Sequence, residues 1–298
     1  MTTSLASSSS PSSSASPSAL LLYSLENHFL YNSCIRLGAY IQSNMQAFDC
    51  PTHDMEHIYR VASLAVNIYY KETLGSRQVN EICKGDIVCF LTAVFHDIFD
   101  SKLQNKDVLV IEMELIEVLR ESFISSSQSC SIDLKAVLHS MDDNDITEII
   151  SNIRKVGYKH LIKETFDRED KALTLEYKCT QDADLLDAIG AIGVARAFTY
   201  GGKMKRMIYA NDDNLTINIS HAEYTKQHYV DNIKLNSVQH FFDKLLNIKG
   251  RVFTQTAKGL AEKRHKFLVI YLEELDAELK EGGGRDCDFL ARKIKLVR

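Results

Sequence analysis

The feature that most constrains the fold is the absence of proline from most of the chain. Only three prolines occur in 298 residues, and none lies between residues 52 and 298. Because proline breaks helices, this stretch can form long helices, and its apolar residues recur with helical spacing. We therefore predict an all-α fold, one multi-helix bundle, with helices at 20–46, 53–73, 79–98, 105–122, 131–140, 144–155, 171–197, 235–248 and 253–280.

The two ends of the chain differ from its middle. Residues 2–18 are serine-rich and cannot bury enough apolar surface to offset the entropy of ordering, so we expect 1–18 to be a disordered tail. The glycines of "EGGGR", residues 281–285, end the last long helix. No repeat of fixed period interrupts the pattern. The prediction is one helical domain over 19–281, followed by a C-terminal tail at 282–298.

Charge and cysteine content exclude several classes of partner. A net charge of −5 gives no overall basic field for a nucleic-acid polymer or an anionic membrane. No apolar run reaches the length of a membrane span, and we expect no secretory signal. The seven cysteines form no CxxC pair, so we expect free thiols in a reducing compartment, the cytoplasm before the nucleus or an organelle. The sequence leaves open whether the chain forms a homo-oligomer.

Polar residues interrupt the apolar helices in a few places, and the first is "PTHDMEHIYRVASLA", residues 51–65. His53 and His57 are four residues apart and share a helix face. His57 also shares a face with Val61 and Leu64, which points it inward. Taken alone, such a histidine is most simply a core residue that is hydrogen-bonded to a carbonyl.

The second place is "AVFHDIFDSK", residues 93–102, which ends a nearly continuous apolar run. Burying an imidazole and a carboxylate there is costly without compensation. His96 and Asp97 point about 100° apart on a helix, so they can meet one ion only near the helix end. Asp100 flanks the same position and Lys102 follows. The alternative is a solvated helix end, at which His96 is incidental.

The third place is "QDADLLDAIGAIGVARAF", residues 181–198. Asp182, Asp184 and Asp187 would repel one another on a half-buried helix unless a cation or a partner were present. The alternative is that they lie in a first helical turn, where the helix dipole favours acids. Gly190 and Gly193 would let another helix approach closely.

Basic residues are scattered along the chain, and the sequence does not place them relative to the acids. The candidates are Arg60, Lys102, Arg196, Lys203, Lys205, Arg206, Lys244, Lys263 and Arg264. Most such residues only solvate a helix face.

Together these motifs supply two imidazoles and two or three carboxylates. Mixed nitrogen and oxygen ligands suit a divalent transition metal. We expect Mn²⁺, ahead of Ni²⁺, Co²⁺, Fe²⁺, Zn²⁺ or Mg²⁺, at the centre of the bundle. Four protein ligands in an octahedral field would leave two positions for water and a phosphate oxygen.

The spacing of these residues resembles the H…HD…D signature of the HD-domain metal-dependent phosphohydrolases. The longer strings "HDMEHIYRV", "HDIFDSK" and "QDADLLDAIGAIGVARAFTYGG" are similar to the small HD hydrolases of bacteria and fungi. "HFFDKLLNIKG" and "AEKRHKFLVIYLEEL" are similar to the C-terminal helices of that subfamily, so the resemblance covers roughly residues 45–280. The resemblance implies an all-α fold around a metal, and cleavage of phosphate esters or anhydrides, usually of nucleotides.

The resemblance also implies roles for single residues. The implied metal ligands are His57, His96, Asp97 and Asp184. Asp100 matches the acid that orients or deprotonates the attacking water in related hydrolases, and Lys102 would face the phosphates. Further candidates for substrate contact are His53, Arg60, Asp187 and Arg196. The chain departs from the family pattern at Leu185, where a basic residue is common, and at Phe99, where a small residue is common.

The function that we expect is metal-assisted phosphoanhydride or phosphoester hydrolysis, with nucleoside triphosphates or deoxynucleoside triphosphates as the favoured substrates. One alternative is a nucleotide- or metal-binding regulator that keeps the site with little turnover. Another is a helical interaction scaffold that binds no metal.

Overall fold

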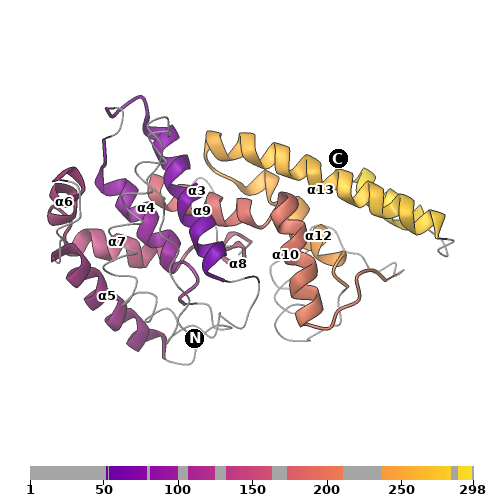
Figure 1. Ribbon diagram of the computed structural model, residues 1–298, viewed down its shortest axis with the longest axis horizontal. Helices are drawn as coiled ribbons and strands as arrows, with labels where there is room; N and C mark the ends of the chain where they lie inside the picture. The colour runs from indigo at the N-terminus through magenta and orange to yellow at the C-terminus, as the bar shows by residue number, and fades with distance from the viewer. Residues whose placement is uncertain are drawn as a thin grey trace, which may run out of the picture.

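A computed structural model describes residues 52, 54–78, 81–99, 107–124, 132–162, 173–210, 236–282 and 288–296 of the chain (Figure 1). Throughout these ranges the regular structure is helical, without a strand, which confirms the predicted all-α fold. The helices are α3 (Met55–Thr73), α4 (Lys84–Phe95), α5 (Val108–Ile124), α6 (Ile132–His139), α7 (Asp143–Ile153), α8 (Tyr158–Leu161), α9 (Leu175–Asp187), α10 (Gly190–Lys203), α12 (Gln239–Asp243), α13 (Gln255–Glu281) and α14 (Asp288–Lys295), with 3₁₀ turns η3 (Leu245–Asn247) and η4 (Lys249–Arg251).

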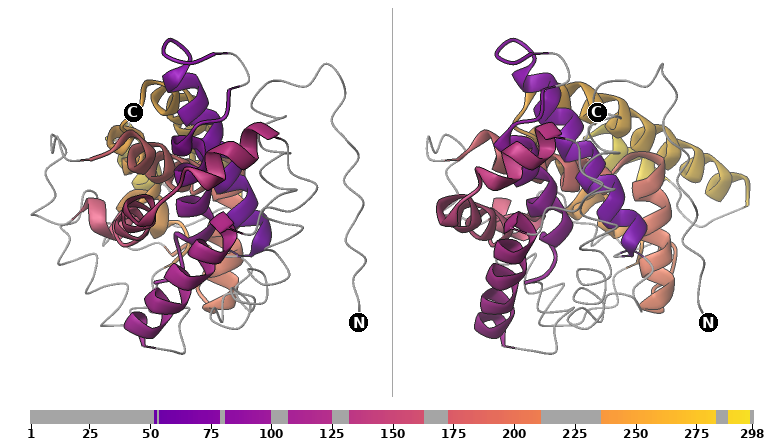
Figure 2. Two further views of the ribbon diagram at one scale, coloured as in Figure 1. Left: turned by 90° about the vertical axis from the view of Figure 1, so that its left-hand side faces the viewer. Right: turned by 60° about the vertical axis from the view of Figure 1, so that its left-hand side comes forward.

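Helices α3, α4 and α9 pack on one another and form the centre of the fold. In α4, every residue from Gly85 to Phe95 is buried, which is why its sequence is apolar almost all round. Helix α3 is amphipathic instead, and it buries Val61, Ala65 and Ile68. Helix α7 covers α4 on one side, and α13 packs on α9, α10 and α3 on the other (Figures 1 and 2). The predicted metal-site residues come from these three central helices and their ends.

The helix predicted at 171–197 is in fact two helices, α9 and α10, that are separated by Ala188 and Ile189. Gly190 has φ +78°, a left-handed conformation that a residue with a Cβ adopts only with strain. A Cβ at Gly193 would lie 2.2 Å from the carbonyl oxygen of Ala188, so this turn also needs glycine there. Helical periodicity continues across the break, and for that reason the pattern alone predicted one helix. The turn brings Arg196 of α10 back towards α9.

The C-terminal elements also differ from the prediction. The helix expected at 235–248 is broken into α12 and the 3₁₀ turns, and α8 was not predicted. Part of the predicted tail is helix α14, which packs on α13 and buries Leu290 and Ile294. The predicted tail at 1–18 and helix at 20–46 lie outside the described residues, so the domain limits stay predictions.

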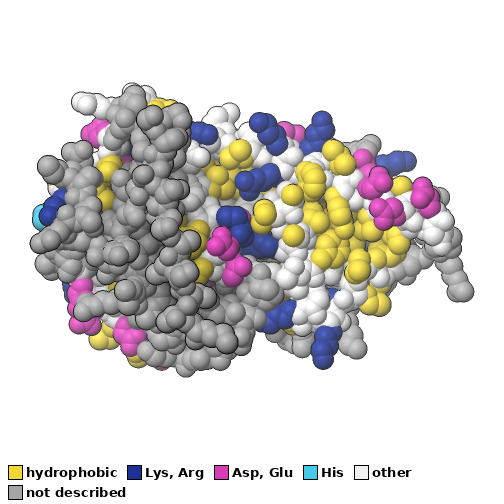
Figure 3. All heavy atoms as spheres, viewed as in Figure 1, with side chains coloured by type: hydrophobic (Ala, Val, Ile, Leu, Met, Phe, Trp, Pro, Cys, Tyr) yellow, Lys and Arg dark blue, Asp and Glu magenta, His cyan; other side chains and the backbone are white. Residues whose placement is uncertain are grey.

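Hydrophobic side chains also gather on the surface over α10 and α13 (Figure 3). Large exposed residues of these helices are Ile192, Phe267 and Ile270. The two helices therefore carry apolar side chains on an exposed face as well as on the buried one. Within the described ranges, no helix combines the length and the apolar character that crossing a membrane requires.

Asp182 of α9 fixes the start of α13. Its carboxylate accepts the backbone N–H groups of Phe253 and Thr254, each at 2.8 Å, and the Thr254 hydroxyl at 2.7 Å. Thr254 is in turn the N-cap of α13. Burial raises the pKa of Asp182 to about 6, although these hydrogen bonds oppose the rise. The first of the three predicted acids is therefore a structural anchor between two helices.

Candidate metal centre

His57 lies in the first turn of α3 and its ring is buried, with a side-chain exposure of 1%. Asp54 caps this helix and accepts the His57 backbone N–H at 2.8 Å. The ring Nδ1 lies 2.7 Å from a carboxylate oxygen of Asp187. A buried carboxylate partner assigns the ring hydrogen to Nδ1, which leaves a lone pair on Nε2.

His96 follows the last residue of α4, where the helix gives way to a turn. Its ring Nδ1 lies 2.7 Å from the carbonyl oxygen of Ala93, one turn back along α4. A carbonyl can only accept, so Nδ1 of His96 donates and its Nε2 also has a lone pair in the neutral ring. The C-terminal end of α4 thus orients the ring of His96 through the backbone carbonyl of Ala93.

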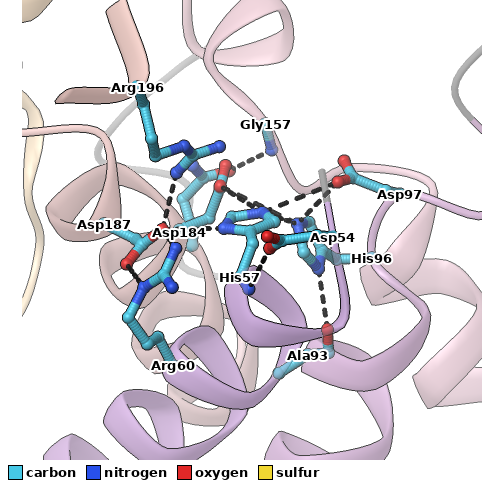
Figure 4. Close-up of polar contacts among 11 residues, drawn as sticks. Asp54, His57, Arg60, Ala93, His96, Asp97, Gly157, Asp184, Asp187 and Arg196 are labelled. Carbon is cyan, nitrogen blue, oxygen red and sulfur yellow. Dashed lines mark hydrogen bonds and ion pairs between the residues drawn. The ribbon is translucent and has the colours of Figure 1, made fainter. Parts of the chain in front are cut away.

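The four predicted ligands converge in space (Figure 4). The Nε2 atoms of His57 and His96 are 3.2 Å apart. An oxygen of Asp97 lies 3.2 Å from Nε2 of His96 and 3.6 Å from Nε2 of His57. An oxygen of Asp184 lies 3.8 Å and 4.0 Å from the same two nitrogens. The family resemblance implied this set, and helices α3, α4 and α9 and their ends bring it together.

The donor set fits a divalent cation. In the neutral rings, two nitrogen lone pairs and two carboxylates would face one another at close range and repel. Burial lowers the pKa of His96, but the carboxylates of Asp97 and Asp184 outweigh it and raise that pKa to about 9. A proton on His96 therefore relieves the repulsion in the metal-free protein. A divalent metal with mixed nitrogen and oxygen ligands can replace that proton. Within the described residues, His57, His96 and Asp97 also form a group whose ligand atoms could share one ion.

The two kinds of candidate ligand differ in their access to solvent. The side chains of His57 and His96 are 1% and 2% exposed, whereas those of Asp97 and Asp184 are 19% and 20% exposed. The cluster therefore reaches solvent on its carboxylate side. A substrate that shares the metal would approach from there.

Asp187 is buried behind His57, between it and two arginines (Figure 4). Besides His57, its carboxylate accepts hydrogen bonds from Arg60, at 2.7 and 3.1 Å, and from Arg196, at 2.6 Å. Burial alone would raise the pKa of Asp187. Hydrogen bonds from His57 and Arg60 and the charge of Arg196 hold it well below the usual range. Asp187 is thus ionised and faces the candidate ligand His57, and its predicted contact with substrate stays a prediction.

The remaining predicted residues have different outcomes. Arg60 and Arg196 lie beside the site through Asp187, and their contact with substrate stays a prediction. His53, Asp100 and Lys102 lie outside the described residues. Phe99 packs against the core, and the Arg154 guanidinium lies 5.1 Å from its ring centroid. Phe99, in the turn that follows α4, therefore has a partner at the C-terminal end of α7, the helix that covers α4.

Two contacts near the site were not predicted from the sequence. The side-chain oxygen of Gln181 accepts the backbone N–H of Gly157 at 2.8 Å, which ties the α7–α8 turn to α9. Gln181 precedes Asp184 by three residues and shares its helix face, a spacing that could have indicated it. The second is the contact of Asp182 with the start of α13. The sequence identified Asp182 as one of three acids, but its partners are 71 and 72 residues away in the sequence.

Comparison with known proteins finds chains that are similar to this one over most of its length. No family model matches the chain. The uncharacterized protein YpgQ of Bacillus subtilis is 28% identical over 228 residues, which are 76% of this chain and 84% of YpgQ. The crystal structure of YpgQ in complex with ADP is 27% identical, with a TM-score of 0.51, and covers 82% of this chain and 96% of YpgQ.

Two further solved structures are similar to the chain. A Lactobacillus plantarum protein is 24% identical, has a TM-score of 0.58, and covers 83% of this chain and 98% of its own, which shows the shared fold. An HD-superfamily hydrolase from Bacillus thuringiensis is 25% identical, with a TM-score of 0.49, and covers 82% of this chain and 97% of its own.

In this all-helical protein a histidine of one helix, an HD pair at the end of a second and an aspartate of a third converge, which is the arrangement that the resemblance to the HD-domain hydrolases implies. The similarity of this chain to YpgQ extends over most of both chains.

Proposed function

We propose that the chain is a metal-dependent phosphohydrolase that cleaves phosphoanhydride or phosphoester bonds of nucleotides. The observation that carries the proposal is the convergence of two imidazole Nε2 atoms 3.2 Å apart with the carboxylates of Asp97 and Asp184. Nothing in the packing of an inert helical scaffold requires such a set. Its burial is costly unless a cation offsets the charge.

His57, His96, Asp97 and Asp184 would hold a divalent cation. When bound, such an ion polarises a phosphoryl oxygen and lowers the pKa of a bound water. The choice of Mn²⁺ ahead of other divalent ions rests on the ligand types and on the family resemblance.

The residues of the chain would supply the other functions. From the family resemblance, Asp100 is the proposed general base, and Lys102 is the proposed phosphate contact. Arg60 and Arg196 are guanidinium groups beside the site, and guanidinium binds phosphate oxygens in pairs. Since Arg60 is 36% exposed, it can reach a ligand while it contacts Asp187.

A nucleotide is the proposed substrate class because YpgQ, to which the chain is similar over most of its length, has been crystallised with ADP. An anionic nucleotide would reach the bound cation from the carboxylate side of the cluster, which is the side exposed to solvent. Nucleoside triphosphates and deoxynucleoside triphosphates are favoured among nucleotides.

The test begins with a metal analysis of the purified protein. A panel of nucleotides and phosphoesters is then incubated with protein and Mn²⁺, and the products are identified by mass. Release of orthophosphate, pyrophosphate or triphosphate identifies the bond that is cleaved, and the Asp184→Asn variant should release none. If metal and nucleotide bind but no product forms, the chain is a binding regulator. If no metal binds, the proposal is wrong.

A further inference from the structure

Asp187 joins the candidate metal centre to two arginines. It lies on α9, three residues after Asp184, so one helix supplies both a candidate ligand and its neighbour. Arg60 lies on α3, three residues after His57, and Arg196 comes from α10, beyond the turn at Gly190. The Asp187 carboxylate therefore has partners on two other helices.

The contact with His57 sets which nitrogen of that ring faces the cluster. Asp187 can only accept at Nδ1, so the hydrogen stays there and the lone pair of Nε2 points towards His96 and the acids. A group at this position that donated a hydrogen bond would favour the other tautomer. Nε2 would then present a hydrogen to the cluster and could not bind a metal.

The two arginines keep Asp187 an acceptor. Arg60 approaches through two nitrogens and Arg196 through one, at distances between 2.6 and 3.1 Å. Guanidinium nitrogens can only donate, so both carboxylate oxygens of Asp187 are held as acceptors. Nδ1 of His57 therefore faces an oxygen that accepts its hydrogen.

We propose that Asp187 is a positioning residue: it holds His57 in the tautomer whose Nε2 can bind a metal, and it ties this ligand to Arg60 and Arg196. The inference rests on the proposed metal site. A carboxylate that orients a metal-bound histidine also raises its basicity, and loss of such a carboxylate typically weakens metal affinity or activity about 10- to 100-fold. A buried ion pair with a purely structural role would alter stability and leave the tautomer of His57 unchanged.

The first experiment reads the tautomer directly. The ring nitrogens of ¹⁵N-histidine-labelled, metal-free protein are recorded by NMR over an alkaline pH series, and the tautomer is read where the ring shifts no longer change with pH. The His57→Gln variant assigns the resonances. We expect the Nδ1–H tautomer for His57 in the natural sequence, and a shift towards the Nε2–H tautomer in Asp187→Asn. An Nε2–H tautomer in the unaltered protein would overturn the proposal, even if Asp187→Asn failed to fold.

The second experiment measures Mn²⁺ affinity by calorimetry without substrate. We expect Asp187→Asn to weaken affinity about 10- to 100-fold, and Asp187→Glu, which keeps the acceptor, to recover part of the loss. The matched control is Asp182→Asn, the same change at another buried position of α9, which contacts the start of α13 and no candidate ligand. Its Mn²⁺ affinity should stay at the level of the unaltered protein.

The results separate the two proposals. If the unaltered protein binds neither Mn²⁺ nor any other of the expected divalent ions, the proposed metal-dependent function fails, whatever tautomer His57 adopts. If the unaltered protein binds Mn²⁺ and Asp187→Asn binds it equally well, the positioning role is wrong and the proposed function stands. Equal losses in Asp187→Asn and Asp182→Asn would show a general structural effect and would also overturn the positioning role.

Discussion

Asp182 and Asp184 are separated by one residue on α9, but the first holds the N-terminus of α13 and the second lies within 4.0 Å of both site histidines. Residues i and i+2 of an α-helix point about 200° apart, so Asp182 and Asp184 face opposite sides of α9. The side of α9 that carries Asp182 anchors the start of α13, and the side that carries Asp184 faces the candidate metal centre. Substitutions at these neighbours should therefore separate stability from metal binding.

Asp182→Ala should destabilise the fold, because it leaves the Phe253 and Thr254 donors without their buried acceptor. We expect a loss of about 2 to 4 kcal/mol in the free energy of unfolding, since each orphaned donor costs about 1 to 3 kcal/mol and water compensates in part. Urea denaturation measures this. Thr254→Ala removes one of the donors together with the cap and should cost less. Unfolding of Asp182→Ala at the urea midpoint of the unaltered protein would contradict the anchor role.

His96→Ala should remove metal binding and activity together, because the ring supplies one of the two converging Nε2 atoms. Asp100→Ala should keep the metal and lose turnover if Asp100 is the general base. Metal content by mass spectrometry and product release by chromatography distinguish the two variants. Normal turnover in Asp100→Ala would show that the base has been wrongly assigned.

The metal-free protein should lose stability as the pH rises from about 6.5 to about 9. His96 has its pKa raised from 6.5 to about 9 in the folded state. Its protonated form therefore stabilises the fold fully below the unfolded value, and this contribution disappears as the pH rises through the folded value. Thermal unfolding against pH in the presence of a chelator measures the effect. His96→Gln should flatten this part of the profile, and an unchanged slope in that variant would argue against the prediction.

Gly190→Ala should be destabilising, and Gly259→Ala should not. At Gly190 a side chain must adopt φ +78° and would place a Cβ 3.0 Å from the Arg264 side chain. Left-handed backbone alone costs a non-glycine residue about 1 to 2 kcal/mol. Gly259 lies inside α13, and a Cβ added there would meet no described atom within 4 Å apart from the nearby backbone of its own helix, so alanine should stabilise the helix by about 0.5 to 1 kcal/mol. Calorimetric melting temperatures that moved in the same direction would contradict this pair of predictions.

The sequence predicted the helical class because the absence of proline and the 3.6-residue pattern extend over nearly the whole chain. It did not predict the break between α9 and α10, because apolar spacing continues through Ala188 and Ile189 while the backbone of Gly190 turns left-handed. Periodicity reports which side is buried, and it carries little information about where a helix changes direction.

For the site, the family resemblance selected the four residues that converge, and residue spacing alone did not. From the sequence, Asp182, Asp184 and Asp187 formed one acidic group that needed a cation. Their partners lie on or beside α13, α3, α4 and α10, so the different surroundings of the three acids appear only when those helices pack. The Ala93 carbonyl that orients His96 is a backbone group, which no side-chain motif records.

The uneven exposure of the cluster has a consequence for the order of events in the proposed reaction. The side chains of His57 and His96 are buried, and the solvent-exposed side of the cluster carries the carboxylates of Asp97 and Asp184. A polyphosphate that arrived before the cation would meet charge of its own sign. The productive order of binding would therefore be metal first, or metal and nucleotide together as one complex. Free nucleotide in excess should act as an inhibitor, because it would bind the metal ion in solution.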